Sequence, residues 1–125
     1  MDNDRKQILE SCLKVIAGIA DKEYQRRVWI LGEGEKIDDF DETACNFFQD
    51  GNGIINHYKD FEVTDKQQHL LVKLRDAFEE FCEGPALKYC LPQEFLATPE
   101  WQNITEIAQE TLQAFDHKTN ISSPL

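Results

Sequence analysis

The sequence has little of what builds a metal site or a disulfide scaffold. Its four cysteines lie 33, 37 and 8 residues apart, so none forms the close Cys-x-x-Cys pair of a structural zinc site. Cys12, Cys45 and Cys82 fall on or beside apolar stripes, which predicts small, buried side chains. Cys90 lies in a predicted loop and is the candidate for exposure.

Long apolar runs are also missing. No stretch approaches the roughly 20 apolar residues that span a bilayer. The apolar residues between Ile8 and Ile19 are interrupted by Glu10, Ser11 and Lys14, so they do not form the continuous apolar core of a secretory signal. We therefore expect a cytoplasmic protein with reduced cysteines.

Signatures of catalysis and ligand binding are absent as well. The sequence contains no Gly-x-Ser-x-Gly, no phosphate-binding loop and no His-Glu-x-x-His. Asp50-Gly51-Asn52 begins like a calcium loop, but Phe61 occupies its twelfth position, where calcium needs a glutamate. The histidines are predicted to lie on polar helix faces: His57, His69 and His117. This pattern predicts neither a cofactor nor a catalytic residue, although a catalytic pair formed by distant residues stays open.

Bulky apolar residues are plentiful despite the high charge. Of 125 residues, 41% are hydrophobic, including eight Phe, two Trp and three Tyr, which suffices for one core without metal or disulfide. The 24 acidic and 13 basic side chains give a net charge of −11. Such a charge repels nucleic acid and anionic membranes, so neither is expected as a partner. It suits a basic protein partner, or it serves solubility alone.

Apolar residues recur at helical spacing, and no convincing alternating strand is present. The sequence predicts an all-α bundle of five or six helices, forming a single domain over residues 1–116 with a flexible tail over 117–125. We expect Leu74 and Phe78 in the core. The expected helices cover residues 3–20, 21–31, 39–49, 54–61, 64–83 and 98–115, with a break at 50–53 and a loop or short helical piece over 85–97.

Negative charge is concentrated in one segment. Residues 33–65 hold ten acidic and two basic side chains, a net charge of −8. Because crowded like charges cost stability, this surplus favours a binding face for an electropositive partner. Solvated acids at a helix N-terminus, which the helix dipole favours, are the alternative. The density is highest at Glu33, Glu35, Asp38, Asp39, Asp41 and Glu42.

Three stretches together resemble a known group of proteins: Trp29-Ile30-Leu31-Gly32-Glu33-Gly34, Asp38-Asp39-Phe40-Asp41-Glu42 and Phe47-Phe48. The chain is similar over residues 29–82 to small acidic bacterial proteins associated with immunity proteins of contact-dependent inhibition and other polymorphic toxin systems. It departs from the four-helix colicin-type immunity proteins, whose recognition-helix pattern is missing. The resemblance implies a partner that is a toxin domain, often a nuclease with a basic cleft.

The leading hypothesis is therefore a non-catalytic protein that binds a basic partner, such as a toxin, through an acidic face. A small regulatory or adaptor domain without a toxin partner is the second hypothesis. A carboxylate- or metal-dependent enzyme built on residues 38–42 is the third, and it requires those acids to converge in a cleft. The predicted partner-binding residues are Glu33, Glu35, Asp38, Asp39, Phe40, Asp41 and Glu42.

Overall fold

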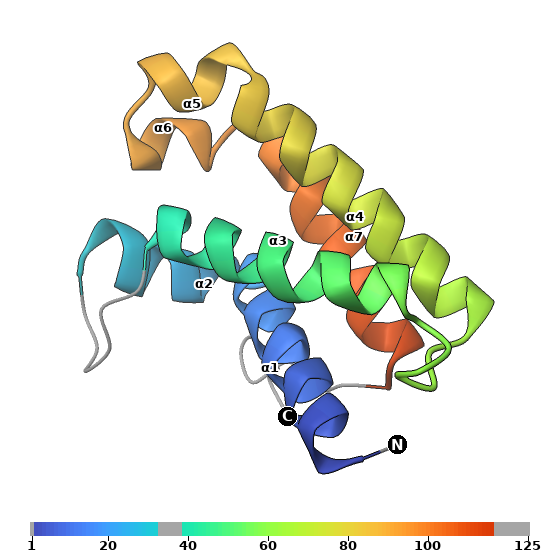
Figure 1. Cartoon of the computed structure of the whole chain (residues 1–125). Helices are drawn as coiled ribbons and strands as arrows, with labels where there is room; N and C mark the ends of the chain where they lie inside the picture. Colours follow the sequence, from blue (N-terminus) through green and yellow to red (C-terminus); the bar gives the residue numbers. More distant parts are fainter. Residues whose placement is uncertain (1, 33–38, 117–125) are drawn as a thin grey trace.

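A computed structural model describes residues 2–32 and 39–116 of the chain. Within these ranges the protein is all-α, with seven α-helices, one π-helical segment and no strand (Figure 1). The elements are α1 (Asn3–Ile19), α2 (Lys22–Tyr24), the π-helix η1 (Gln25–Ile30), α3 (Phe40–Asn56), α4 (Asp65–Glu83), α5 (Pro85–Tyr89), α6 (Pro92–Phe95) and α7 (Pro99–Ala114).

Side-chain caps set where the helices begin. The carboxylate of Asp39 accepts a hydrogen bond of 2.8 Å from the Glu42 N–H, and Asp21 caps α2 in the same way. Thr64 forms a complete capping box at the start of α4, and Thr98 caps α7. These four caps lie at the predicted starts of the helices over 21–31, 39–49, 64–83 and 98–115, because a cap depends on residues only two or three positions apart.

The predicted break at residues 50–53 is wrong, because α3 continues through Gly51 and Gly53 to Asn56. Gly51 is buried, and a Cβ there would lie 3.4 Å from the Phe47 ring. Ile54 and Ile55 then continue the buried stripe of the same helix. Packing of this stripe outweighs the roughly 1 kcal/mol that each glycine costs a helix. The predicted helix over 54–61 is correspondingly replaced by turns after Asn56.

The helix count also exceeds the predicted five or six. Residues 85–97 form two short helices, α5 and α6, and each begins with a proline in its first turn. The predicted helix after Asp21 becomes α2 followed by a π-helix, which the Leu31 N–H closes by donating to the Arg26 carbonyl five residues back.

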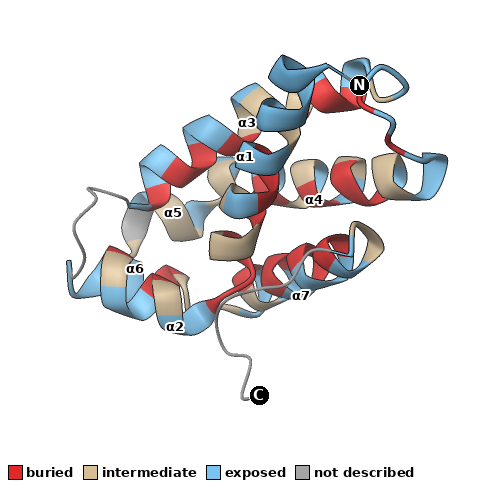
Figure 2. Ribbon diagram, turned by 90° about the horizontal axis from the view of Figure 1, so that it is seen from below, coloured by how far each residue is buried: buried red, intermediate tan, exposed pale blue. Residues whose placement is uncertain are grey.

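The main core lies between α1, α3, α4 and α7. In Figure 1, α4 and α7 run antiparallel side by side, and α3 crosses in front of them. Figure 2 shows that the buried residues of α4 and α7 lie on their facing sides. Leu74 and Phe78 are fully buried, which confirms their predicted place in the core.

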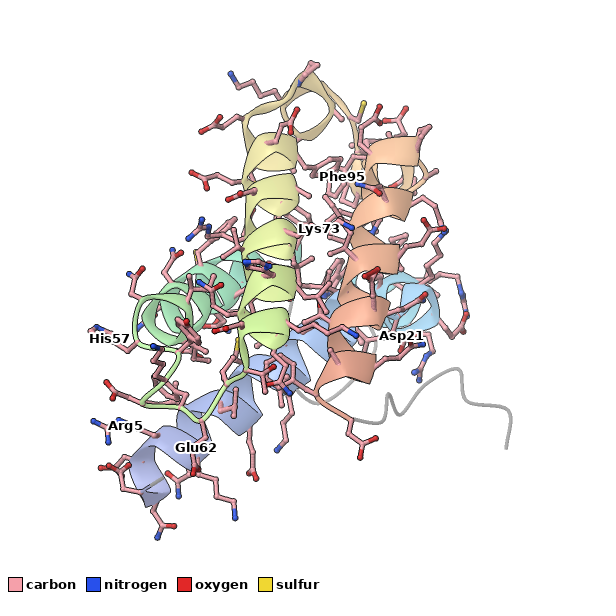
Figure 3. The ribbon with its side chains drawn as sticks, turned by 90° about the vertical axis from the view of Figure 1, so that its right-hand side faces the viewer. Arg5, Asp21, His57, Glu62, Lys73 and Phe95 are labelled. Carbon is pink, nitrogen blue, oxygen red and sulfur yellow. The ribbon has the colours of Figure 1, made fainter. Side chains whose placement is uncertain are left out.

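Helices α5 and α6 form an excursion between the end of α4 and the start of α7 (Figure 1). Phe95 fastens it to the core: only 4% of the residue is exposed, and its ring centroid lies 5.0 Å from that of Phe40. Figure 3 labels Phe95 at the end of the molecule where α4 stops and α7 begins. In the described part of the chain, no helix has the length and apolar character needed to cross a membrane.

Candidate functional site

The predicted acidic segment is described from Asp39 onward. Asp39, Asp41 and Glu42 are exposed at the start of α3, where Asp39 caps the helix through Oδ1. Glu33, Glu35 and Asp38 lie outside the described residues. The helix dipole favours acids in this first turn, so these three carboxylates do not by themselves indicate a binding site.

Phe40 does not belong to this exposed group. It is 6% exposed, and its ring contacts those of five other aromatic residues. Phe40 was predicted as part of an exposed binding face, but the structure places it as a buried residue that anchors the start of α3. The five rings belong to Trp29, Phe78, Phe81, Phe95 and Trp101.

A second set of acids comes from α4. Burial, together with the smaller electrostatic effect of the carboxylates of Asp41, Glu79 and Glu83, raises the pKa of the Cys82 thiol to about 11. These carboxylates come from two helices far apart in the sequence, and each is near enough to affect the pKa of this half-buried thiol. We call the exposed residues Asp39, Asp41, Glu42, Glu79 and Glu83 the acidic face.

Glu79 and Glu83 occupy unfavourable positions. They are four residues apart on α4, where like charges repel, and Glu83 lies in the last turn, where the helix dipole disfavours an anion. The last turn of α4 contains no basic residue. The ion pairs found between described residues lie elsewhere, at Asp2–Arg5, Glu23–Arg26, Glu23–Arg27 and Arg75–Asp76. No described cation therefore forms an ion pair with the acidic face.

The contribution of α4 was missed in the sequence, although a signal was present. Two glutamates at i and i+4 near the end of a helix bounded by Gly84 contradict normal charge placement. Their proximity to Asp41 depends on how α3 packs against α4, which no local pattern reveals.

A cleft of about 420 Å³ opens beside the acidic face. Helices α5 and α6 form one side, and η1 with the start of α3 forms the other. Asp39 and Asp41 are its exposed acidic residues, so they lie at the mouth. The other lining residues are apolar: Trp29, Phe40, Leu87, Pro92, Phe95 and Leu96.

The cleft has few of the groups that catalysis uses. Its described lining holds carboxylates and apolar side chains, without a histidine, cysteine, serine or lysine. His57 lies at the opposite end of the 17-residue α3, about 25 Å from Asp39 at the rise of an α-helix. In residues 2–32 and 39–116, no three His, Cys, Asp or Glu side chains group as metal ligands. The groups that this cleft offers to a ligand are therefore two carboxylates and an apolar lining.

The cysteines differ in exposure from the prediction. Cys12 is buried as expected, and burial raises the pKa of its thiol to about 12. Cys45 is exposed, because the buried stripe of α3 passes through its neighbour Ala44 instead. Cys82 and Cys90 are partly buried.

Comparison of the chain with protein families, with curated proteins and with solved structures found no match.

Proposed function

We propose that this chain is a non-catalytic binding protein whose acidic face holds a basic protein. The placement of Glu79 and Glu83 carries the proposal. An anion at the C-terminal end of a helix lowers the stability of the fold by a few tenths of a kcal/mol at low ionic strength, and so does a pair of like charges at i, i+4. Solubility alone does not require acids at these positions, since the same charge is tolerated on any exposed helix face.

The two helix ends act together in this proposal. Carboxylates from the start of α3 and the end of α4 both act electrostatically on Cys82, and no described basic side chain forms an ion pair with them. Such a concentration of one sign speeds the encounter with an oppositely charged surface and discriminates against other partners. The resemblance over residues 29–82 favours a toxin domain with a basic cleft as the partner, and neutralising that toxin as the biological role.

Affinity capture from the native cells tests this proposal with two matched baits. The face variant combines Asp41→Asn, Glu42→Gln, Glu79→Gln and Glu83→Gln, and it leaves the Asp39 cap intact. The control variant removes the same number of exposed charges elsewhere, through Glu10→Gln, Asp60→Asn, Glu106→Gln and Glu110→Gln.

The proposal expects a basic protein that the wild-type chain and the control variant retain and that the face variant loses. Circular dichroism checks that both variants are folded. The opposite result is a specific partner retained equally by all three baits, which would place the binding surface elsewhere. If both variants lose the partner equally, binding depends on the total charge of the protein and not on this face.

A further inference from the structure

The cleft beside the acidic face combines two kinds of surface. Three of its lining residues are aromatic, Trp29, Phe40 and Phe95, and all three are at least nine-tenths buried, so their rings lie at its base. Its mouth carries the carboxylates of Asp39 and Asp41. At about 420 Å³ it is within the size range of clefts that bind small ligands, so one or two side chains of a partner fit.

These two surfaces favour a group that is flat, apolar along its length and positively charged. A neutral apolar side chain would cover the carboxylates without pairing them, which costs desolvation energy. A lysine ammonium is compact and strongly hydrated, and it meets a carboxylate as a point charge without a fixed geometry. An arginine guanidinium is planar and more weakly hydrated, and it can form two parallel hydrogen bonds with a carboxylate while its stem packs on apolar surface.

The helix N-terminus beside the cleft does not reverse this preference. The start of α3 carries about half a positive elementary charge. Asp39, Asp41 and Glu42 in the same turn together carry up to three negative charges, so the local field attracts a cation. The cap uses Oδ1 of Asp39, and an ionised carboxylate has two oxygens that accept hydrogen bonds.

We propose that this cleft binds an arginine side chain of the basic partner, with its aliphatic stem against the rings and its guanidinium at Asp39 and Asp41. This inference rests on the proposed function and adds to it the group that is recognised. It assigns specificity to the cleft, while the acidic face supplies attraction over a longer range.

A second cleft provides an internal control. It has about 460 Å³ and carries two carboxylates, Glu80 and Glu100, but Phe81 is the one aromatic residue in its described lining. Neutralising Glu80 and Glu100 therefore removes the same charge from a site of similar size without the set of three rings.

The test is an NMR titration of ¹⁵N-labelled protein with the peptides acetyl-Gly-X-Gly-amide, where X is arginine, lysine, citrulline or norleucine. We expect saturable shifts of the Trp29 indole N–H with the arginine peptide, which should bind about fivefold or more tightly than the lysine peptide. Citrulline and norleucine should give no saturation in the same range. The indole of Trp101 is fully buried and donates to Gln25, so it serves as a reference.

Three variants separate the cleft from bulk charge. Asp39→Asn with Asp41→Asn should abolish the arginine preference and still fold, because asparagine caps a helix as well as aspartate does. Leu87→Trp, which fills the cleft and leaves every carboxylate, should abolish it too. Glu80→Gln with Glu100→Gln should leave it unchanged.

Two results would overturn the inference, and they differ in what they imply. In the first, the arginine and lysine peptides give equal shifts that spread over the acidic face and do not saturate at Trp29. The cleft would then not be the recognition site, and the proposed function would still stand. No shift of any acidic-face resonance with either cationic peptide would contradict the proposed function as well.

Discussion

Two glycines allow a direct test of the backbone, because the same substitution should change stability in opposite directions. Gly53 lies in the last turn of α3, and Gly32 follows η1. A Cβ added at either position meets no atom within 4 Å, so packing does not distinguish them. Backbone conformation does, since Gly32 has a φ of +70° whereas Gly53 is helical.

Replacing Gly53 with alanine should stabilise the protein by about 0.5–1 kcal/mol, the difference between the two residues in a helix. Replacing Gly32 with alanine should destabilise it by about 1 kcal/mol, because an L-residue is strained at a positive φ. Urea unfolding followed by circular dichroism at 222 nm measures both. In thermal unfolding, each change amounts to a shift of roughly 2–6 °C in Tm for a chain of this size.

The sequence-based expectation of a turn at residues 50–53 gives the contrary result for Gly53. A turn with a positive φ there would make Gly53→Ala destabilising, like Gly32→Ala. A loss of stability in both variants would therefore refute the continuous α3 helix. An intact helix also requires that circular dichroism of Gly53→Ala shows no loss of helical signal.

Other predictions concern the core, a buried acid and the thiols. Phe40→Ala should lower the free energy of unfolding by about 3–5 kcal/mol in urea unfolding, since its ring contacts five others, whereas a near-neutral result would return Phe40 to the surface. Burial raises the pKa of Asp21 above its ordinary 3.8, and its Oδ2 is buried without a hydrogen-bond partner among the described residues. Folding therefore favours the protonated form of Asp21. Its contribution to the free energy of unfolding is fully present below pH 3.8 and is lost as pH rises through the raised pKa. Asp21→Asn, which keeps the cap, should therefore unfold at higher urea than wild type at pH 7 and lose this advantage below pH 3.8; a constant difference across pH would contradict the assignment. With iodoacetamide at pH 8, mass spectrometry should find exposed Cys45 alkylated before Cys82 and Cys12, whose pKa values are about 11 and about 12, and early modification of Cys12 would be inconsistent with the fold.

Much of the fold was predictable because helix boundaries depend on local chemistry. The caps at Asp21, Asp39, Thr64 and Thr98 each involve a side chain and a backbone N–H two or three residues away. The break at Gly51 was predicted wrongly for the same reason. Local propensity favours a turn there, and the packing of Phe47 and its helix against the rest of the core decides otherwise.

The candidate site was predictable only in part. Phe40 was grouped with its acidic neighbours by composition, although buried residues recur in α3 at helical spacing, at positions 40, 44, 47, 51 and 54. That apolar stripe can be recognised in the sequence, and it predicts that Phe40 lies in the core. Glu79 and Glu83 join Asp41 through the packing of α3 on α4, and the cleft depends on where α5 and α6 return to the core. Neither arrangement follows from a pattern within one segment.

The rate of association with the basic partner tests the central claim most directly. Stopped-flow measurements between about 50 and 300 mM salt would compare the wild-type chain with the face variant and the control variant. At low salt, we predict that the face variant associates about tenfold more slowly than the other two and that its rate depends less on salt. In urea unfolding, the same variant should be as stable as wild type or slightly more stable, because the repulsion between Glu79 and Glu83 is gone. A face variant that associates at the wild-type rate with the wild-type salt dependence would contradict the claim that this face binds the partner.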